Sequence, residues 1–410
     1  TPFNTGNDIW GAPSAADIDN DQEIEFIIAS KSKQIFILDK NGNQEALFDA
    51  SQFLTATPAI GNIDSDVDLE IIIGSMSNSG KIFGINHDGS LVNGFPVEIN
   101  EKIWVGSAII DMNNDGIDEI LVTTDSGNFY VINNDGTIDD NFTINTNYNI
   151  RSAPSVAVFN DNQEKLIFFG NDNGDFYCLN DNGSIEYIIN TGYSIRSTPS
   201  FVEYNNNTYI FFTSDNNLIH CIDINGVYLP GWPITINSEI KSSCNFADLD
   251  LDQIPEIILS SKNGNIFVFH LDGTIYDNFP MNLNRTIENT PIIVDIDNDQ
   301  DLEIITGDSK GLSIIDVKTN GQVEAWNLFR SNSYRNGVFN IVNTDICSNQ
   351  ILGDLNCDLS IDVTDIIIIV DIILNQILPS GSQVISSDMN VDDTIDILDV
   401  LILINIILES

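Results

Sequence analysis

The sequence predicts an all-β fold, a seven-bladed β-propeller, followed by a small all-α domain. An apolar strand that ends in a D/N-G turn recurs seven times at intervals of 43 to 48 residues, and a period of this length is typical of propeller blades. A strand of small residues keeps the same period, and long apolar runs with helical character follow only after residue 360. The glycines of the turns are Gly42, Gly89, Gly136, Gly183, Gly226, Gly273 and Gly321.

Each repeat contains four predicted strands. In the first repeat, the first three strands are APSAADI, EFIIAS and QIFILD. A weaker fourth strand follows the D/N-G turn, and GFPVEI is an example from the second repeat. Alternating β-branched and aromatic residues between Gly, Asn, Asp and Ser favour strands throughout. We expect residues 326–337 to supply the outer strand of blade seven. The N-terminal TPFNT resembles the same strand, so the terminus that closes the ring is left open.

The formal charge of −46 excludes nucleic acid and anionic membrane surfaces as direct partners. Polar residues interrupt every long apolar run, so we expect no membrane span. The chain begins at Thr1 without Met or a charged-then-apolar leader, as a processed mature chain or an internal fragment would. We expect a processed protein outside the cell or at its surface.

Acidic loops follow the first strand in five of the seven repeats. Each has Asp or Asn at positions 1, 3 and 5, a free carbonyl at position 7 and Glu at position 9. Oxygen ligands at alternate positions of a tight loop suit Ca²⁺, which takes six to eight oxygens. The predicted side-chain ligands are Asp17, Asp19, Asp21 and Glu25; Asn62, Asp64, Asp66 and Glu70; Asp111, Asn113, Asp115 and Glu119; Asp248, Asp250, Asp252 and Glu256; and Asp295, Asp297, Asp299 and Glu303. The position-7 carbonyls are those of Glu23, Asp68, Ile117, Ile254 and Asp301. Repeats four and five, with VFNDNQEKL and VEYNNNTYI, lack this set and are predicted to bind no metal there.

The repeat resembles the FG-GAP/VCBS repeats of integrin-α-like seven-bladed propellers. The resemblance covers residues 1–337 and is carried by the small strand with Pro, the DxDxD loop with its Glu, and the D-G turn. It implies a calcium-rigidified platform for adhesion, sugar binding or protein binding.

Two loops near the C-terminus, DLNCDLSIDVTD from residue 354 and DMNVDDTIDILD from residue 388, each precede an apolar helix. They resemble the paired F-hand calcium loops of dockerin domains, over residues 351–410 after a connector at 338–350. The resemblance implies two further calcium ions, about seven in all. It assigns as ligands Asp354, Asn356, Asp358, Ser360, Asp362 and Asp365, and Asp388, Asn390, Asp392, Thr394, Asp396 and Asp399. Leu359 and Asp393 occupy the position at which such loops usually have a Gly in a sharp turn. Whether Cys347 and Cys357 form a disulfide is left open.

The two C-terminal helices, 366–374 and 400–408, are apolar on every face. Packing them together buries one side only, which predicts a contact with a cohesin-like protein or with a neighbouring copy, and in the second case a filament. The alternative is that the module folds back on its own propeller.

A candidate ligand face is predicted three residues before the Pro, or its equivalent, of each small strand, where the repeats carry Trp10, Thr55, Val105, Arg151, Arg196, Lys241 and Glu288. Trp10, Arg151, Arg196 and Lys241 suit a carboxylate or an acidic sugar; alternatively, the cations only neutralise surrounding acid. The chain has no HExxH, GxSxG or phosphate-loop motif. We therefore expect a non-enzymatic binding or scaffold protein, with glycans among its expected ligands. The alternative is a carbohydrate-active accessory or lyase-type propeller.

Overall fold

The computed structural model describes residues 3–159, 164–341, 352–355, 360–373, 386–390 and 394–409. The chain divides into two compact units, Thr1–Val202 with Ile210–Ile341, and Glu203–Tyr209 with Val342–Ser410. No helix in the described ranges is both long enough and apolar enough to cross a membrane.

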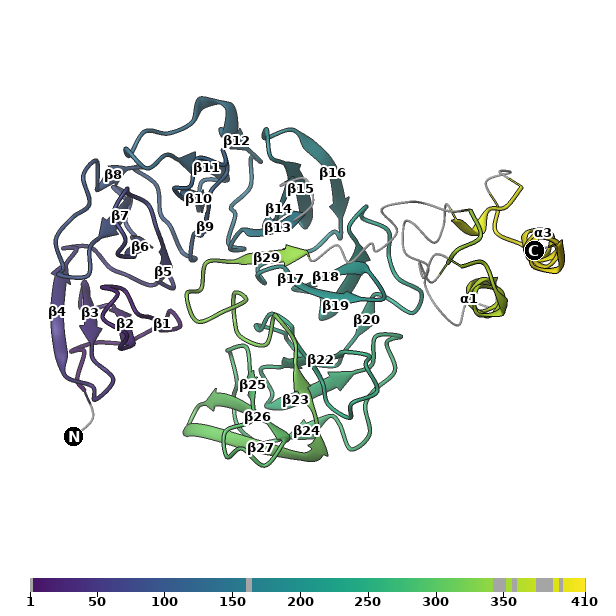
Figure 1. Cartoon of the computed structure of the whole chain (residues 1–410). Coiled ribbons are helices and arrows are strands. Elements are labelled where there is room, and N and C mark those ends of the chain that lie inside the picture. Colours follow the sequence, from purple (N-terminus) through teal and green to yellow (C-terminus); the bar gives the residue numbers. More distant parts are fainter. Residues whose placement is uncertain are drawn as a thin grey trace. The chain divides into compact units, whose positions relative to one another are not determined.

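Seven β-sheets surround a common centre, which confirms the predicted propeller (Figure 1). Blades one to three consist of β1 (Ser14–Ala16), β2 (Glu25–Ser30), β3 (Gln34–Leu38) and β4 (Gln44–Asp49); β5 (Ala59–Gly61), β6 (Glu70–Gly74), β7 (Lys81–Ile85) and β8 (Val97–Glu98); and β9 (Ala108–Ile110), β10 (Glu119–Thr123), β11 (Asn128–Ile132) and β12 (Ile144–Asn145). A short 3-10 helix, η1 (Asp140–Phe142), precedes β12.

Blades four to seven continue the series. They consist of β13 (Ser155–Phe159), β14 (Lys165–Gly170), β15 (Asp175–Asn180) and β16 (Ile185–Asn190); β17 (Ser200–Tyr204), β18 (Asn207–Ser214), β19 (Leu218–Asp223) and β20 (Ile234–Thr235); β21 (Asn245–Asp248), β22 (Glu256–Ser260), β23 (Asn265–Phe269) and β24 (Met281–Asn282); and β25 (Ile292–Val294), β26 (Asp301–Asp308) and β27 (Gly311–Asn320). Two further strands, β28 (Gln322–Val323) and β29 (Val338–Ile341), pair with β21 and β13 respectively.

The D/N-G turns form as expected in the first six blades. Their glycines, from Gly42 to Gly273, have φ between 80° and 88°, a region that costs a residue with a Cβ atom more than it costs glycine. Gly321 in blade seven does not share this conformation, because β27 continues to Asn320 and β28 leaves the blade to pair with β21.

Residues 326–341, which we call the central segment, run through the middle of the ring (Figure 1). The prediction that residues 326–337 form the outer strand of blade seven is therefore wrong. The first strands of six blades donate backbone N–H groups to carbonyls of this segment: Phe246 to Trp326, Ile293 to Asn327, Ala15 to Ser333, Ile60 to Tyr334, Ile109 to Asn336 and Val156 to Gly337, at 2.9 to 3.3 Å. These innermost strands would otherwise present unpaired edges to the channel. The hydrogen bonds that the central segment makes to these edges therefore stabilise its central position more than pairing as an outer strand of blade seven would.

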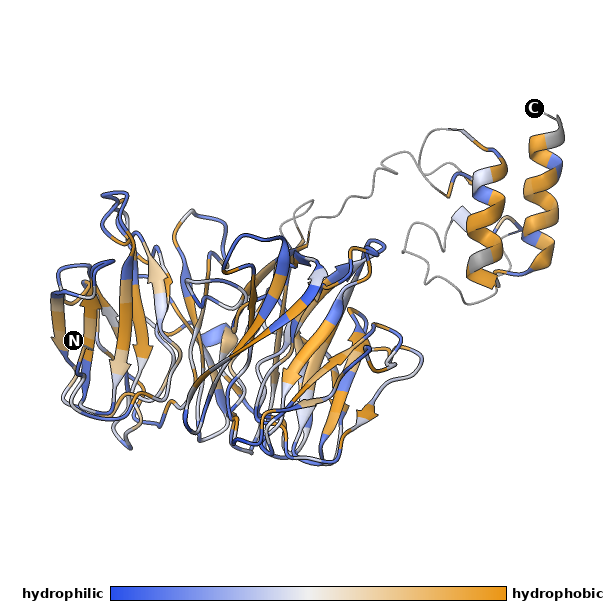
Figure 2. Ribbon diagram, turned by 90° about the horizontal axis from the view of Figure 1, so that it is seen from below, coloured by the Kyte–Doolittle hydropathy of each residue, from blue (hydrophilic) through white to orange (hydrophobic). Residues whose placement is uncertain are grey.

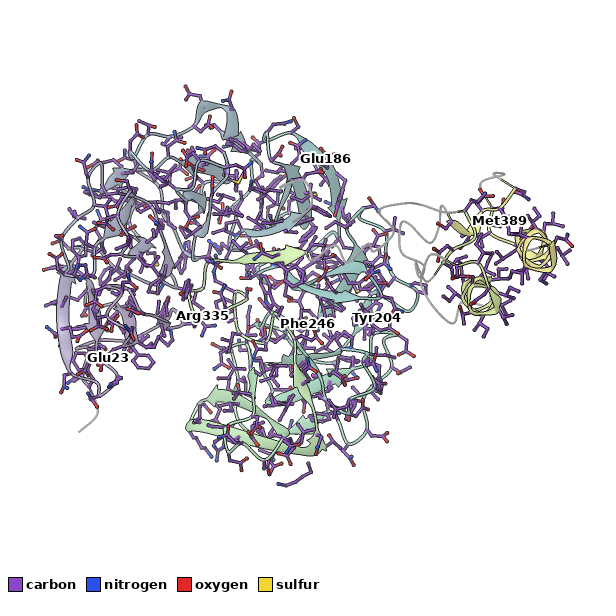
Figure 3. All side chains as sticks on the ribbon, viewed as in Figure 1. Glu23, Glu186, Tyr204, Phe246, Arg335 and Met389 are labelled. Atoms are coloured by element: carbon purple, nitrogen blue, oxygen red, sulfur yellow. The ribbon has the colours of Figure 1, made fainter. Side chains whose placement is uncertain are left out.

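Two arginines fix the central segment. Arg330 is buried, and its guanidinium donates to the carbonyls of Ser107, Pro154 and Arg335. Arg335, labelled near the middle of the ring in Figure 3, donates to the carbonyls of Pro13 and Phe329. Burial lowers the pKa of Arg330 to about 9 and that of Arg335 to about 10. The segment continues as β29, so the first residues of the expected connector lie along β13.

The C-terminal unit contains α1 (Val363–Ile373) and α3 (Ile397–Glu409). Figure 2 shows both helices as almost entirely hydrophobic. Leu355, Ile369, Met389 and Leu403 belong to the buried core of this unit, and Figure 3 labels Met389 beside the helices. The small all-α domain is confirmed.

Candidate functional site

The acidic loops of the five predicted blades share one hydrogen bond. The carboxylate of the position-9 Glu accepts the backbone N–H of position 2 at 2.7 to 3.0 Å, in the pairs Ile18 and Glu25, Ile63 and Glu70, Met112 and Glu119, Leu249 and Glu256, and Ile296 and Glu303. All five Glu residues are buried. They are held by the start of the second strand in each blade, so each loop closes over a fixed carboxylate.

Position 1 shapes the rest of the loop. The Asp17 carboxylate accepts the N–H groups of Asp21 and Gln22 at 3.0 and 2.9 Å, and Asp111 and Asp248 accept from the equivalent positions of their loops. The backbone turns with positive φ at Asn20 and Gln22, and again at the equivalent residues of blades three, six and seven. These bonds curl the loop so that oxygens at alternate positions face inward.

In four blades the carboxylate oxygens converge within 4.8 Å of one another. The clusters are Asp17, Asp19 and Glu25; Asp64, Asp66 and Glu70; Asp248, Asp250 and Glu256; and Asp297, Asp299, Asp301 and Glu303. One oxygen each of Asp19, Asn62 and Asp301 is buried there without a hydrogen-bond partner among the described residues. Buried polar atoms of this kind need a partner, and a hard cation that prefers oxygen ligands supplies one. The residues fit calcium.

Burial raises the pKa of Glu70 and Glu256 to about 8, against the opposing effect of their backbone hydrogen bonds, and neighbouring carboxylates raise it further. Burial also raises the pKa of Glu119 to about 7. A divalent cation beside such groups provides the opposite charge that keeps them ionised. The loops are thus arranged for ionised ligands around a positive centre.

Some predicted ligands fold the loop instead of joining a cluster. Asp21 accepts the N–H of Glu23, Asp252 that of Ile254 and Asp295 that of Asn298, at 2.6 to 2.8 Å. Blade three differs most, because the Asn113 amide donates to Glu119 at 3.0 Å. Lys165 of blade four, which is buried, donates to Asn114 of the same loop at 2.7 Å. A neighbouring cation therefore lies beside the blade-three loop.

Blade five has no acidic loop. β17 and β18 are joined by a turn at Asn205 and Asn206, whose φ values are 48° and 58°, a conformation that suits tight hairpins. The corresponding loop of blade four, residues 160–163, lies outside the described residues.

The two C-terminal loops repeat one geometry at an interval of 34 residues. Asp365 accepts the N–H groups of Leu355 and Asp362 at 2.8 and 2.9 Å. Asp399 accepts from Met389 and Asp396, both at 2.8 Å. Asp354, Asp365 and Asp399 are buried. Position 12 thus ties both ends of each loop to the helix that follows. Asn356, Asp358, Asp392 and the cysteines Cys347 and Cys357 lie outside the described residues.

A hollow of about 470 Å³ lies where the leading loops of the blades meet the central segment. All seven blades contribute to its lining, which includes Trp10, Thr55, Arg196 and Lys241, and the central segment adds Phe329. Three of the four predicted ligand-face residues therefore line one cavity. Arg151 is not part of the lining, and its guanidinium lies 5.4 Å from the ring centroid of Trp104.

Sequence reasoning missed Trp104, which stacks on Trp10 with ring centroids 6.5 Å apart. It stands one position before the residue that the repeat pattern selected, so a search for aromatic residues adjacent to that pattern would have found it. Phe329 was missed because the central segment was assigned to the rim of blade seven.

The fold and the loops define a β-propeller with candidate calcium sites, joined to a paired-loop helical module. The family model of the lambda-carrageenase beta-propeller domain matches residues 71–210, and that of the dockerin type I domain matches residues 352–408. The chain therefore combines a propeller with a C-terminal dockerin type I domain. Neither match names FG-GAP/VCBS repeats, so that part of the resemblance stays a prediction.

Solved structures share the propeller fold at low sequence identity. The V. cholerae biofilm matrix protein Bap1 is 14% identical, with a TM-score of 0.55 over 79% of this chain and 81% of that chain. BBS1N, in complex with ARL6DN, is 12% identical, with a TM-score of 0.53 over 77% and 92%. The Dos1 propeller is 12% identical, with a TM-score of 0.52 over 72% and 75%. No curated protein gives a significant sequence match. These likenesses show the fold alone.

Proposed function

We propose that the chain is an extracellular, calcium-stabilised, non-catalytic binding protein that its dockerin attaches to a cohesin on another protein. The observation that carries the proposal is the dockerin type I match over residues 352–408, together with the repeated loop-and-helix geometry of that unit. Dockerin domains bind cohesins. On this proposal the dockerin attaches the chain to its partner, and the propeller is the domain that binds a ligand.

The exposed surface of the dockerin supports an apolar contact. Val363 and Ile367 on α1, and Ile397 and Leu401 on α3, are exposed, and the two pairs occupy equivalent positions of the repeat. The sequence from residue 345 to the C-terminus contains no Lys or Arg. A partner surface that is apolar at its centre and basic at its rim complements this module.

The test is binding of the full chain to a panel of recombinant cohesins in calcium, measured by isothermal titration calorimetry. The double variant Ile367→Asp/Leu401→Asp places a charge on both equivalent helix positions, and we expect it to weaken binding at least 100-fold. Leu312→Asp, at an exposed apolar site of β27, is the matched control and leaves binding unchanged. The absence of binding to every cohesin would contradict the proposal, and calcium-dependent filaments seen by electron microscopy would replace the cohesin with a second copy.

A second function is favoured by one observation, the match of residues 71–210 to the propeller domain of lambda-carrageenase. On this alternative the chain acts on a polysaccharide instead of only binding it. Incubation with polysaccharides, followed by size-exclusion chromatography, separates the two: shortening of the polymer over time supports an enzyme, whereas retention of full length supports the binding protein.

A further inference from the structure

The hollow lies at the centre of the propeller, against the central segment. The central segment occupies the channel behind it, and its Phe329 joins the lining of the cavity. The volume of about 470 Å³ lies within the range of small-ligand sites, which is about 300–1,000 Å³. A ligand therefore enters from one face and cannot pass through the ring.

The charges around the hollow are already paired. Arg196 contacts Asp172 at 2.8 Å and Asp215 at 3.1 Å, and Arg151 contacts Asp125 at 2.7 Å and Asp172 at 3.8 Å. Lys241 and Lys262 share Glu239 at 2.7 and 3.1 Å, and Lys262 reaches Glu288 at 3.5 Å. The acids of this rim outnumber its cations. An anionic ligand would have to break these pairs, so the structure favours the interpretation that the cations neutralise neighbouring acid.

Two other polar groups of residues that line the hollow are buried without a hydrogen-bond partner among the described residues. Thr55 is only 6% exposed, it lines the cavity, and its hydroxyl has no hydrogen-bond partner among the described residues. The indole N–H of Trp104 is likewise buried without a partner there. Beside them, Trp10 is 55% exposed and is held by stacking on Trp104 and by the Lys31 ammonium 4.2 Å from its ring centroid. A buried hydroxyl and an indole donor without partners indicate a polar ligand, and the rigid aromatic wall indicates one with an apolar face.

We propose that this hollow binds the uncharged terminal sugar units of a polysaccharide. A pyranose presents hydroxyl groups for Thr55 and the Trp104 N–H, and an apolar C–H face for Trp10. The closed rear of the hollow selects chain ends or branches over the middle of a polymer. This inference rests on the proposed function, because it names the ligand of the propeller that the dockerin attaches. The cohesin assay described above tests the attachment separately.

The experiment measures binding of the full chain in calcium to neutral hexasaccharides of glucose, mannose, xylose and galactose. Sulfated and uronic-acid hexasaccharides of equal length are the comparison probes, and isothermal titration calorimetry gives Kd. We expect a neutral hexasaccharide to bind most tightly, with a Kd that added salt leaves unchanged because no ion pair forms.

The variants locate the site. We expect Trp10→Ala to weaken binding at least about tenfold, as loss of an aromatic anchor does, and Thr55→Val to weaken it about two- to tenfold through the lost hydrogen bond. Tyr193→Ala is the matched control, since Tyr193 is also 55% exposed but does not line the hollow. Three outcomes would overturn the inference: stronger binding of the acidic hexasaccharides, no binding of any neutral one, or equal losses of affinity in Trp10→Ala and Tyr193→Ala. An unchanged Kd for cohesin in these variants shows that attachment is intact.

Discussion

Blades one and five of the same ring are stabilised by different means. Blade one buries Ile27, Ile35 and Ile37 and carries an acidic loop whose carboxylates converge. Blade five buries Phe201, Phe211 and Phe212, and a two-residue turn replaces the loop. Within one repeat, therefore, either a cation site or a larger apolar core accompanies the first two strands.

Aromatic residues in blades four and five form a continuous stack. Phe176 of blade four lies 3.9 Å from Phe212 of blade five, measured between ring centroids, and Phe212 stacks on His220 at 4.6 Å. Phe168 of blade four contacts Phe201 of blade five at 5.5 Å. Aromatic side chains bury more apolar surface than Ile or Val. We infer that burial stabilises blades four and five where the proposed calcium sites stabilise the other blades. The two groups of blades should then respond differently to calcium, mutation and pH.

The largest expected effect is that of chelation. Calcium that binds only the native chain adds about 2.7 kcal/mol per site when its concentration is about 100 times Kd, so removing it from several loops should lower the melting temperature by more than about 10 °C. Hydrogen exchange measured by mass spectrometry should show the loss first at β1, β2, β5 and β6, with β18 and β19 still protected. Equal loss of protection in all seven blades would remove the distinction between the two groups.

Phe212→Ala tests the apolar side of the comparison. Truncating a fully buried Phe costs about 3–5 kcal/mol, and Phe212 is fully buried between Phe176 and His220. We expect this loss of unfolding free energy to be the same with calcium and with a chelator, as measured by urea denaturation. A loss that disappears without calcium would show that blade five depends on the acidic loops after all.

The repeat made the blades and their loops predictable, because strand alternation, D/N-G turns and alternate oxygens are local properties of the chain. The central segment was not predictable in this way. Its residues Trp326, Arg330 and Arg335 acquire their roles from six blades that lie up to more than 300 positions away in sequence, and WNLFRSNSYRNG alone resembles another strand. The pairing of the cations around the hollow was also hidden, because Asp125, Asp172 and Asp215 meet Arg151 and Arg196 only after neighbouring blades pack together.

Acidification should affect blade five through His220. Burial lowers the pKa of His220 to about 4, below its ordinary value of about 6.5. Between these values the unfolded chain binds more protons than the native chain, so stability falls as the pH falls from 6.5 to 4, by about 2 kcal/mol at pH 5. His220→Phe keeps a ring against Phe212 but does not titrate. The unfolding free energies of the two proteins, measured from pH 7.5 to 5 in excess calcium, should converge on the acid side, and parallel curves would exclude His220 as the cause.

Asp19→Asn tests one cation site in blade one. Asp19 belongs to the converging cluster and has a buried oxygen without a partner among the described residues. Replacing this carboxylate by a neutral amide reduces the charge that attracts calcium, and we expect about tenfold weaker binding in that loop, or about 1.4 kcal/mol. Protection of β1 and β2 from hydrogen exchange, followed against free calcium, reports that loop separately from the others. Asp49→Asn, at the other end of strand β4 of the same blade, removes an exposed charge away from the cluster and should leave the calcium midpoint unchanged.

The reciprocal change, Asn113→Asp, should have the smallest effect and the opposite sign. Blade three carries an amide at this position, and that amide donates to Glu119 while Lys165 lies at the neighbouring Asn114. An Asp there adds a fourth carboxylate for calcium, but it loses the bond to Glu119 and places two acids together. The calcium-free protein should therefore become less stable and the calcium-bound protein slightly more stable. The calcium midpoint for protection of β9 and β10 should therefore fall by less than about tenfold, because Lys165 still offsets part of the ion's attraction. The calcium midpoint could instead stay the same while stability falls at every calcium concentration. Asn113 would then stabilise the loop only through its hydrogen bond, and blade three would belong with blades four and five, which we expect not to depend on calcium.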